Sequence, residues 1–213
     1  MRNYVRQKKF GVCFRIPGGW WSRGYLPHCD QVGVTHFVTI RLADSLPQAV
    51  RNMLQARAQV LSLATNSDPR LSRDYILQVE ASLDRGYGAC WLRRPEVAQV
   101  VIDSFEFLVQ VGHEIVRWVI MPNHLHFLIR LRPGLQLSPV VNSFKSFTAK
   151  ESNKVLGRSK PFWYPEYFDR YIRDSEHLRR TISYIDFNPV RARLVMQPKD
   201  WIFGSAGCPK HER

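Results

Sequence analysis

The sequence is poor in cysteine and in acidic residues. Its four cysteines, Cys13, Cys29, Cys90 and Cys208, form no CxxC pair, so neither a zinc ribbon nor a disulfide framework is indicated and free, mostly buried thiols are expected. Only 18 Asp and Glu stand against 31 Lys and Arg, which gives a formal net charge of +13. Such an excess favours binding to a polyanion, and nucleic acid is the first candidate.

The sequence also lacks a long hydrophobic run. No stretch approaches the roughly 18 apolar residues of a membrane-spanning helix, and no single helix gathers the arginines into a membrane-binding face. The N-terminus has no apolar run long enough for a secretory signal. We therefore expect a cytoplasmic protein, associated with the nucleoid, that has no membrane partner. A hydrophobic fraction of 45% over 213 residues is enough for one folded domain.

The first 34 residues are rich in Gly, Pro, Trp and Arg and have neither helical nor strand periodicity. We interpret residues 1–34 as an N-terminal arm that is basic and aromatic. Two roles stay open for it. Arg23 and Tyr25 could enter a groove of a nucleic acid, or the arm could form a strap over the hydrophobic core with Trp20, Trp21 and Tyr25.

Hydrophobic spacing and turn residues predict the elements of the rest of the chain. Strands are expected at 35–42, 113–121 and 124–131, and helices at 46–64, 72–86, 94–112, 137–156 and 175–189, with a loop and then a strand within 160–176. Ser138 and Ser175 are the expected helix caps, and Pro189 the expected end of the last helix. This order predicts a ferredoxin-like α+β fold, an antiparallel sheet with helices on one face. The main domain spans 35–203, with a helical insertion at about 48–91, and residues 204–213 form a tail.

Two histidines stand one residue apart in the predicted strand 124–131. Side chains alternate along a strand, so His124 and His126 share a face while Leu125 points to the other. Two imidazoles side by side can supply two nitrogen ligands to a divalent metal. The pattern alone leaves two possibilities, a metal or catalytic site and an ordinary surface or buried pair.

In the segment "TISYIDFNP", Tyr184 and Asn188 are four residues apart, hence one helical turn. One possibility is structural, with Tyr184 at the edge of the core and Asn188 capping the helix before Pro189. The other is functional, with Tyr184 as a nucleophile and Asn188 as an oxygen ligand to a metal.

Three motifs together resemble the REP-associated tyrosine transposases, a branch of the single-tyrosine HUH transposases. They are "GYLPHCDQVGVTHFVTIRLADSLP", "MPNHLHFLI" and "YFDRYIRDSEHLRRTISYIDFNPVRARLV". The likeness runs from Gly24 to Phe203, with the region 48–91 less characteristic. One departure is Arg193, which stands where many members of the family have glycine.

The resemblance implies an HUH nuclease domain that cuts single-stranded DNA beside a hairpin, at repetitive extragenic palindrome (REP) elements. By the same likeness, His124, His126 and Asn188 would hold Mg²⁺ or Mn²⁺, and Tyr184 would form a 5′-phosphotyrosine intermediate. No nucleotide cofactor is needed, and by analogy the protein is a monomer. The alternatives are a non-catalytic module that binds single-stranded DNA or RNA, and a metal-dependent hydrolase that uses water.

Basic and aromatic residues near the proposed nucleophile are candidates for contacts to the DNA backbone and bases. Tyr164, Tyr167 and Tyr171 compete with Tyr184 as nucleophile but are better explained as stacking residues among arginines. The predicted nucleic-acid contacts are Arg23, Tyr25, Lys145, Arg170, Arg173, Arg179, Arg180 and Arg191.

Overall fold

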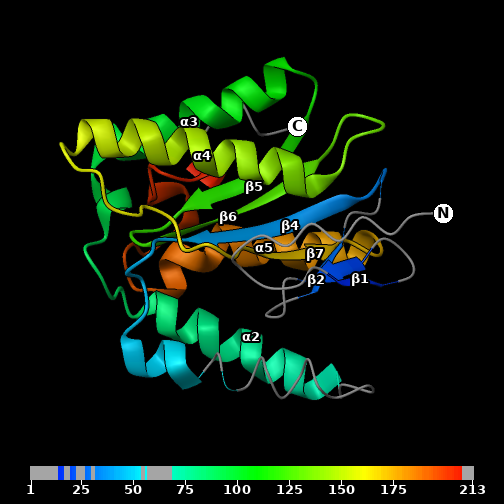
Figure 1. Cartoon of the computed structure of the whole chain (residues 1–213), viewed down its shortest axis with the longest axis horizontal. Helices are drawn as coiled ribbons and strands as arrows, with labels where there is room; N and C mark the ends of the chain where they lie inside the picture. The colour runs from blue at the N-terminus through cyan, green and yellow to red at the C-terminus, as the bar shows by residue number, and fades with distance from the viewer. Residues whose placement is uncertain are drawn as a thin grey trace.

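A four-stranded antiparallel sheet forms the centre of the computed structural model, which describes residues 32–53, 56 and 77–207 in full and only the backbone of 14–16, 20–22, 27–29 and 69–76. Its strands are β4 (Thr35–Arg41), β5 (Glu114–Ile120), β6 (His124–Arg130) and β7 (Phe168–Tyr171). The spatial order is β5-β6-β4-β7, the order of a ferredoxin-like sheet. The predicted α+β fold with an antiparallel sheet is therefore confirmed (Figure 1).

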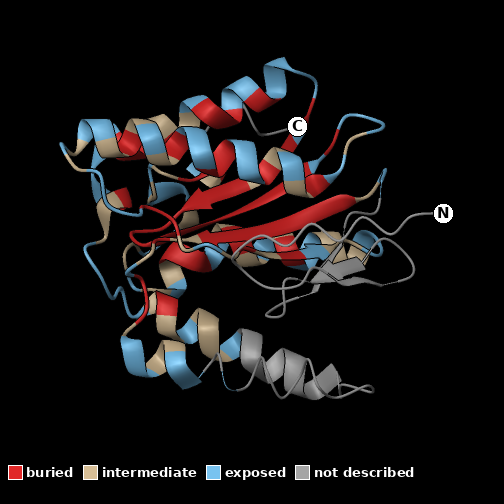
Figure 2. Cartoon of the chain, viewed as in Figure 1, coloured by how far each residue is buried: buried red, intermediate tan, exposed pale blue. Residues whose placement is uncertain are grey.

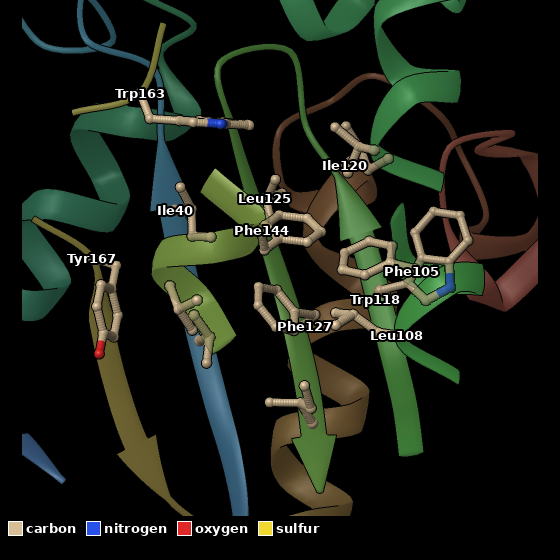
Figure 3. Close-up of a cluster of buried hydrophobic side chains, with 14 of the residues drawn as sticks. Ile40, Phe105, Leu108, Trp118, Ile120, Leu125, Phe127, Phe144, Trp163 and Tyr167 are labelled. Atoms are coloured by element: carbon tan, nitrogen blue, oxygen red, sulfur yellow. The ribbon is translucent and has the colours of Figure 1, made fainter. Parts of the chain in front are cut away.

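Helices α3 (Pro95–Gln110) and α4 (Leu137–Val155) cover one face of this sheet. Alternate residues of the strands point into the core beneath them, and Figure 3 shows Phe105, Phe127 and Phe144 packed together there. The ring centroids of Phe105 and Phe127 are 5.2 Å apart and those of Phe105 and Phe144 are 5.3 Å apart. Burial of these large side chains is the main source of stability for this layer.

Helix α5 (Ser175–Arg191) lies on the opposite face. The expectation that all helices cover one face is therefore wrong. The physical reason is that α5 has its own apolar stripe, which includes Leu178, Ile182 and Ile185 and packs on Phe37 and Leu128 from the second face of the sheet. The sheet is thus buried on both sides, as the red strands of Figure 2 show.

The ends of two helices differ from the predicted ones. Asp174, not Ser175, caps α5, and its carboxylate accepts a hydrogen bond from the backbone N–H of His177 at 2.7 Å. Helix α5 continues through Pro189 to Arg191. Because Pro189 lies in the last turn, its lack of an N–H removes only one backbone hydrogen bond of the helix. Helix α4 begins after Gln136 without a side-chain cap, so Ser138 lies inside it.

The chain leaves α5 through a tight turn at Arg193. The N–H of Arg193 donates to the carbonyl of Val190 and the N–H of Leu194 donates to that of Pro189. This pair of bonds is a Schellman motif, whose central residue takes left-handed angles. Arg193 accordingly has φ 58°, a conformation that favours glycine.

Segments outside the sheet complete the fold. Backbone strands β1 (Phe14–Ile16), β2 (Trp20–Ser22) and β3 (Pro27–Cys29) pair into a small antiparallel sheet, which the aperiodic sequence did not predict. In the region of the predicted insertion, residues 48–53 are helical and α2 (Pro69–Asp84) follows. Three short 3₁₀ helices are also present: η1 (Trp91–Arg93), η2 (Pro198–Asp200) and η3 (Ser205–Gly207).

The closing segment near the C-terminus packs along β5. The backbone N–H of Ile120 donates to the carbonyl of Phe203, and the indole of Trp201 donates to the carbonyl of Ile120. This placement covers the edge strand of the sheet, which would otherwise expose unpaired backbone groups. None of the helices within the described part of the chain has the length and apolar character needed to span a bilayer. Residues 208–213 of the predicted tail lie outside the described residues.

Candidate active site

The two histidines of β6 lie side by side on the face of the sheet that α5 covers. His126 pairs with Thr39 and His124 with Arg41 across the β4–β6 ladder, while Leu125 and Phe127 enter the core on the other face. Both imidazoles are buried, with ring centroids 4.7 Å apart. The predicted shared face of the pair is confirmed.

Burial keeps both imidazoles neutral. It lowers the pKa of His124 to about 3, and it lowers the pKa of His126 well below the ordinary value, with His124 and Arg191 acting in the same direction. Each ring also has a polar partner at its Nδ1 atom: Asn123 Oδ1 for His124 at 2.8 Å and Thr39 Oγ1 for His126 at 2.8 Å. Neutral imidazoles held in this way are the form that binds metals, and a second group at the other nitrogen is the usual support for a metal ligand.

Asn123 connects this pair to the end of α2. Its amide nitrogen donates to the carbonyls of Leu83 at 3.2 Å and Tyr87 at 3.0 Å. Its amide oxygen therefore faces His124 as an acceptor, so His124 carries its proton on Nδ1 and has a lone pair on Nε2. Asn123 was not among the predicted site residues, although its position directly before the histidine motif was an available signal.

Tyr184 projects from α5 toward the histidines. Its hydroxyl lies 3.4 Å from Nε2 of His126, and its ring meets the ring of Phe37 edge to face at a centroid distance of 5.9 Å. Tyr164, by contrast, packs its ring 3.4 Å beneath the guanidinium carbon of Arg41, and Tyr167 is buried in the core under α4. Among the tyrosines whose side chains the structure describes, Tyr184 is the one bonded to a histidine of the pair.

Asn188 lies one turn beyond Tyr184, at the buried side of α5. Its side chain is completely buried, yet within the described residues neither its amide oxygen nor its amide nitrogen has a hydrogen-bond partner. An unpaired buried amide costs about 1 to 3 kcal/mol, and such a group calls for a ligand or ion. The described residues contain no cluster of three or more His, Cys, Asp and Glu suited to a metal. The amide oxygen of Asn188 is chemically able to add an oxygen ligand to the two nitrogens of the histidine pair.

Charged residues from α2 and α5 surround the tyrosine. Glu80 and Asp84 lie on α2, and both carboxylates act on the charge state of Tyr184. The guanidinium carbon of Arg191 lies 4.8 Å from the centre of the tyrosine ring, and its Nη2 lies 3.8 Å from Asp84. Burial, followed by the negative charge of Glu80, raises the pKa of Tyr184 above its ordinary value, whereas Arg191 lowers it.

Glu80 and Asp84 were not among the predicted site residues. They lie on α2, inside the region whose sequence is least characteristic, and nothing in the local pattern indicates that this helix ends beside the sheet. The hydrogen bonds from Asn123 to Leu83 and Tyr87 are what bring it there.

The arginines predicted to contact nucleic acid have exposed side chains near α5. Arg179 and Arg180 both form ion pairs with Glu176, and Arg170 lies over the ring of Phe168 at 5.7 Å. Arg173 and Arg191 are also exposed. Arg23 and Tyr25 lie outside the described residues.

Lys145 has a structural position that does not favour the DNA contact expected for it. It is buried on α4, and its ammonium group donates to the carbonyls of Tyr164 at 2.9 Å and Pro165 at 2.6 Å. The lysine thereby fixes the loop before β7. Tyr167 likewise belongs to the core, which leaves no exposed ring for stacking on a base.

Comparison with known proteins places this arrangement in context. Residues 95–188, which include both histidines, Tyr184 and Asn188, match the family model of IS200-like transposases. A REP-associated tyrosine transposase of Escherichia coli K12 is 30% identical over 92 residues, which is 43% of this chain and 53% of that protein. The match therefore spans about half the length of that relative.

Two solved structures of transposases align with parts of this chain. A REP-associated tyrosine transposase bound to a REP hairpin superposes with a TM-score of 0.49 at 20% identity and covers 84% of this chain and 79% of that one. A candidate transposase from Deinococcus radiodurans gives a TM-score of 0.36 at 17% identity, over 76% of this chain and 91% of that one.

Proposed function

Because residues 95–188 of this chain match the family model of IS200-like transposases, we propose that the protein is a metal-dependent endonuclease and strand transferase for single-stranded DNA. The observation that carries the proposal is the position of the Tyr184 hydroxyl, 3.4 Å from Nε2 of His126 in a pair of buried, neutral imidazoles. A tyrosine whose only role is packing does not require a histidine at its hydroxyl. A module that only binds nucleic acid has no need of the pair.

Tyr184 would act as the nucleophile. Its oxygen attacks the phosphorus of a phosphodiester and forms a 5′-phosphotyrosine, while the bond to the 3′ oxygen breaks and leaves a free 3′-OH. The phosphotyrosine link retains the energy of the broken bond, so the strand can be rejoined without a nucleotide cofactor. The target in this proposal is a hairpin of a REP element, the ligand named for the structurally similar transposase.

His124, His126 and Asn188 would hold a divalent cation, Mg²⁺ or Mn²⁺. The residues fit such an ion because both imidazoles are held in the neutral form and the buried amide of Asn188 has no partner among the described residues. When bound, the cation draws charge from a phosphate oxygen and stabilises the leaving 3′ oxygen.

The DNA would approach along the exposed flank of α5 and β7. Arg170, Arg173, Arg180 and Arg191 supply positive charge there, and the whole chain carries +13, so binding should weaken steeply with salt. The ion pairs of Arg180 with Glu176 are surface pairs of small energy and can give way to phosphate.

The arrangement of the site supports a monomer as the active species in this proposal, since one chain supplies the histidine pair, Tyr184 and Asn188 together. A chromosomal substrate would place the protein with the nucleoid in the cytoplasm.

The test is a denaturing gel of the protein incubated with labelled single-stranded REP hairpins in Mg²⁺, Mn²⁺ or EDTA. Wild-type protein should give a protein-linked band that needs the metal, and Tyr184→Phe should abolish it. Tyr164→Phe, which removes only the hydroxyl from the ring that packs on Arg41, should keep the band. Cleavage without a linked band would mean hydrolysis by water, and tight binding without cleavage would mean a binding module.

A further inference from the structure

Arg191 lies between the ring of Tyr184 and a carboxylate of another helix. It is the last residue of α5, and its guanidinium carbon lies 4.8 Å from the centre of the tyrosine ring. Its Nη2 atom lies 3.8 Å from Oδ2 of Asp84, the last residue of α2. One cation is therefore shared between the proposed nucleophile and an acidic side chain.

The backbone holds both partners of this ion pair in place. Leu83, the neighbour of Asp84, is buried, and its carbonyl accepts a hydrogen bond from the amide nitrogen of Asn123 at 3.2 Å. Arg191 follows the buried Pro189 by two residues, in the last turn of α5. The approach of the carboxylate to the guanidinium thus depends on how the ends of α2 and α5 are fixed to the sheet.

The pair is accessible to a ligand and easily opened. The side chain of Arg191 is 45% exposed and that of Asp84 is 21% exposed. An ion pair with such access to water contributes little to stability. A guanidinium recognises carboxylate and phosphate with the same fork of N–H donors. A phosphate of a DNA strand can therefore replace the carboxylate of Asp84 at Arg191.

The direction of the side chains along α5 favours Arg191 over Arg180 as the arginine beside the nucleophile. Side chains of a helix lean toward its N-terminus. Arg191, which comes after Tyr184, leans back over the tyrosine ring. Arg180 comes before Tyr184 and leans away from it, toward its partner Glu176.

We propose that Arg191 binds the phosphate that Tyr184 attacks, and that Asp84 occupies the place of this phosphate in the DNA-free protein. This inference rests on the proposed function. When DNA binds, a non-bridging oxygen of the scissile phosphate replaces the Asp84 carboxylate at the guanidinium. Arg191 then stabilises the negative charge that develops on the phosphate oxygens as the tyrosine oxygen bonds to phosphorus. The arginine stays charged throughout and exchanges no proton.

The first experiment compares full-length wild type, Arg191→Gln and Arg191→Lys in single-turnover adduct formation on a saturating REP hairpin oligonucleotide with Mn²⁺. Loss of one donor to the developing charge should lower the rate in Arg191→Gln by about 100- to 1,000-fold. Lysine keeps the charge but not the planar fork, so Arg191→Lys should retain part of the rate.

A binding measurement in EDTA separates a contact with the scissile phosphate from a general loss of charge. The linkage that wild-type protein cleaves is mapped first, and a second oligonucleotide then has a neutral methylphosphonate at that linkage. In fluorescence anisotropy, the methylphosphonate should weaken binding to wild type several-fold. It should weaken binding to Arg191→Gln much less, because that variant has already lost the contact.

The role of Asp84 is tested by Asp84→Asn, which removes the competing charge. Affinity for the unmodified hairpin should rise by about 2- to 5-fold, the effect expected for loss of an exposed ion pair. The matched controls are Arg94→Gln and Glu96→Gln. These two residues form an exposed pair at 3.6 Å near the start of α3, which covers the other face of the sheet (Figure 1). Both controls should match wild type in rate and in affinity.

Several outcomes would overturn the inference. One is a wild-type rate in Arg191→Gln, and another is an equal methylphosphonate effect in that variant and in wild type. A lower affinity of Asp84→Asn would show that Asp84 prepares the arginine for DNA instead of competing with it. If Arg191→Gln fails to fold, the affinity of Asp84→Asn and the methylphosphonate effect on wild type decide. Absence of any adduct with wild-type protein would count against the proposed function itself, while Asp84→Asn would still test the exchange at Arg191.

Discussion

Asn123 Oδ1 lies 2.8 Å from Nδ1 of His124, and this contact fixes the chemical state of the histidine. The amide nitrogen of Asn123 is committed to two backbone carbonyls, so the oxygen is the atom that meets the ring. His124 must donate, and its Nε2 is left as the free acceptor. In the proposed metal site, this contact would hold His124 ready to bind the cation through Nε2.

Loss of this contact should weaken metal binding. Asn123→Ala removes the group that orients His124, and changes of this kind lower metal affinity by about 10- to 100-fold. Calorimetric titration with Mn²⁺ measures the effect. Asn52→Ala, at an exposed residue bonded to Gln48, is the control and should bind like wild type. Equal affinity in Asn123→Ala would contradict the supporting role.

Asn188→Leu should raise the stability of the metal-free protein and remove its stabilisation by metal. The buried amide has no partner within the described residues, so an apolar side chain of similar size removes a cost of about 1 to 3 kcal/mol. In EDTA the variant should melt at a higher temperature than wild type. Added Mn²⁺ should raise the melting temperature of wild type but not that of the variant. A variant that melts lower in EDTA would show that the amide is satisfied in the folded protein.

The helix that carries Tyr184 is held to β5 by an ion pair. Arg117 Nε lies 2.9 Å from Asp186 Oδ1, and both side chains are largely buried. Asp186→Ala removes the hydrogen bonds that the arginine donates to this carboxylate, so the free energy of unfolding should fall by about 1 to 3 kcal/mol. Urea unfolding measures it. The control is Glu151→Ala, which breaks a 4.0 Å surface pair with Lys154 and should cost little.

Arg193→Gly should stabilise the protein. Arg193 has φ 58° in the Schellman turn after α5, where a side chain is strained and glycine is not. Relief of the strain, less the greater entropy of glycine in the unfolded chain, gives a gain of about 0.5 to 1 kcal/mol. Arg193→Ala keeps a Cβ atom and should bring no gain. Equal stability of the two variants would locate the effect in the lost arginine side chain.

His113 should make the protein sensitive to acid. The backbone N–H of Arg132 donates to its Nδ1 at 3.2 Å, and burial, then the charge of Arg132, lowers its pKa below 6.5. As the pH falls, the His113 imidazole is protonated in the unfolded chain before it is protonated in the folded one. Its contribution to the free energy of unfolding is therefore fully present above pH 6.5 and is lost as the pH drops below it. His113→Asn offers an oxygen acceptor that does not titrate, and it should lose stability less steeply in urea titrations over this range. An unchanged slope would contradict this assignment.

The sequence was sufficient for the four strands of the central sheet and for the relative positions of the candidate site residues along β6 and along α5. Alternation in 124–131 predicted the shared face of His124 and His126, and helical spacing put Tyr184 and Asn188 one turn apart. Both depend on local periodicity, which backbone geometry dictates. The face of the sheet on which α5 lies was missed, since a strand buried on both sides has no polar face to mark the difference.

The residues that surround the site were harder to predict because they are distant in sequence from the residues they contact. Asp84 lies 3.8 Å from Arg191 Nη2 because the end of α2 is bound to Asn123, and no spacing rule connects these segments. The burial of Lys145 was missed for a related reason. The sequence does not distinguish a lysine that donates to the carbonyls of Tyr164 and Pro165 from a solvent-exposed one.

Strand β6 carries Leu125 and Phe127 on the side of the apolar core and the two histidines on the side that α5 covers. A deletion or insertion of one residue within it would exchange the two sides and put both imidazoles among phenyl rings. The strand can therefore change its side chains by substitution but cannot change its length by one. Variation in chain length should be confined to the segments outside the sheet, above all the insertion that ends in α2.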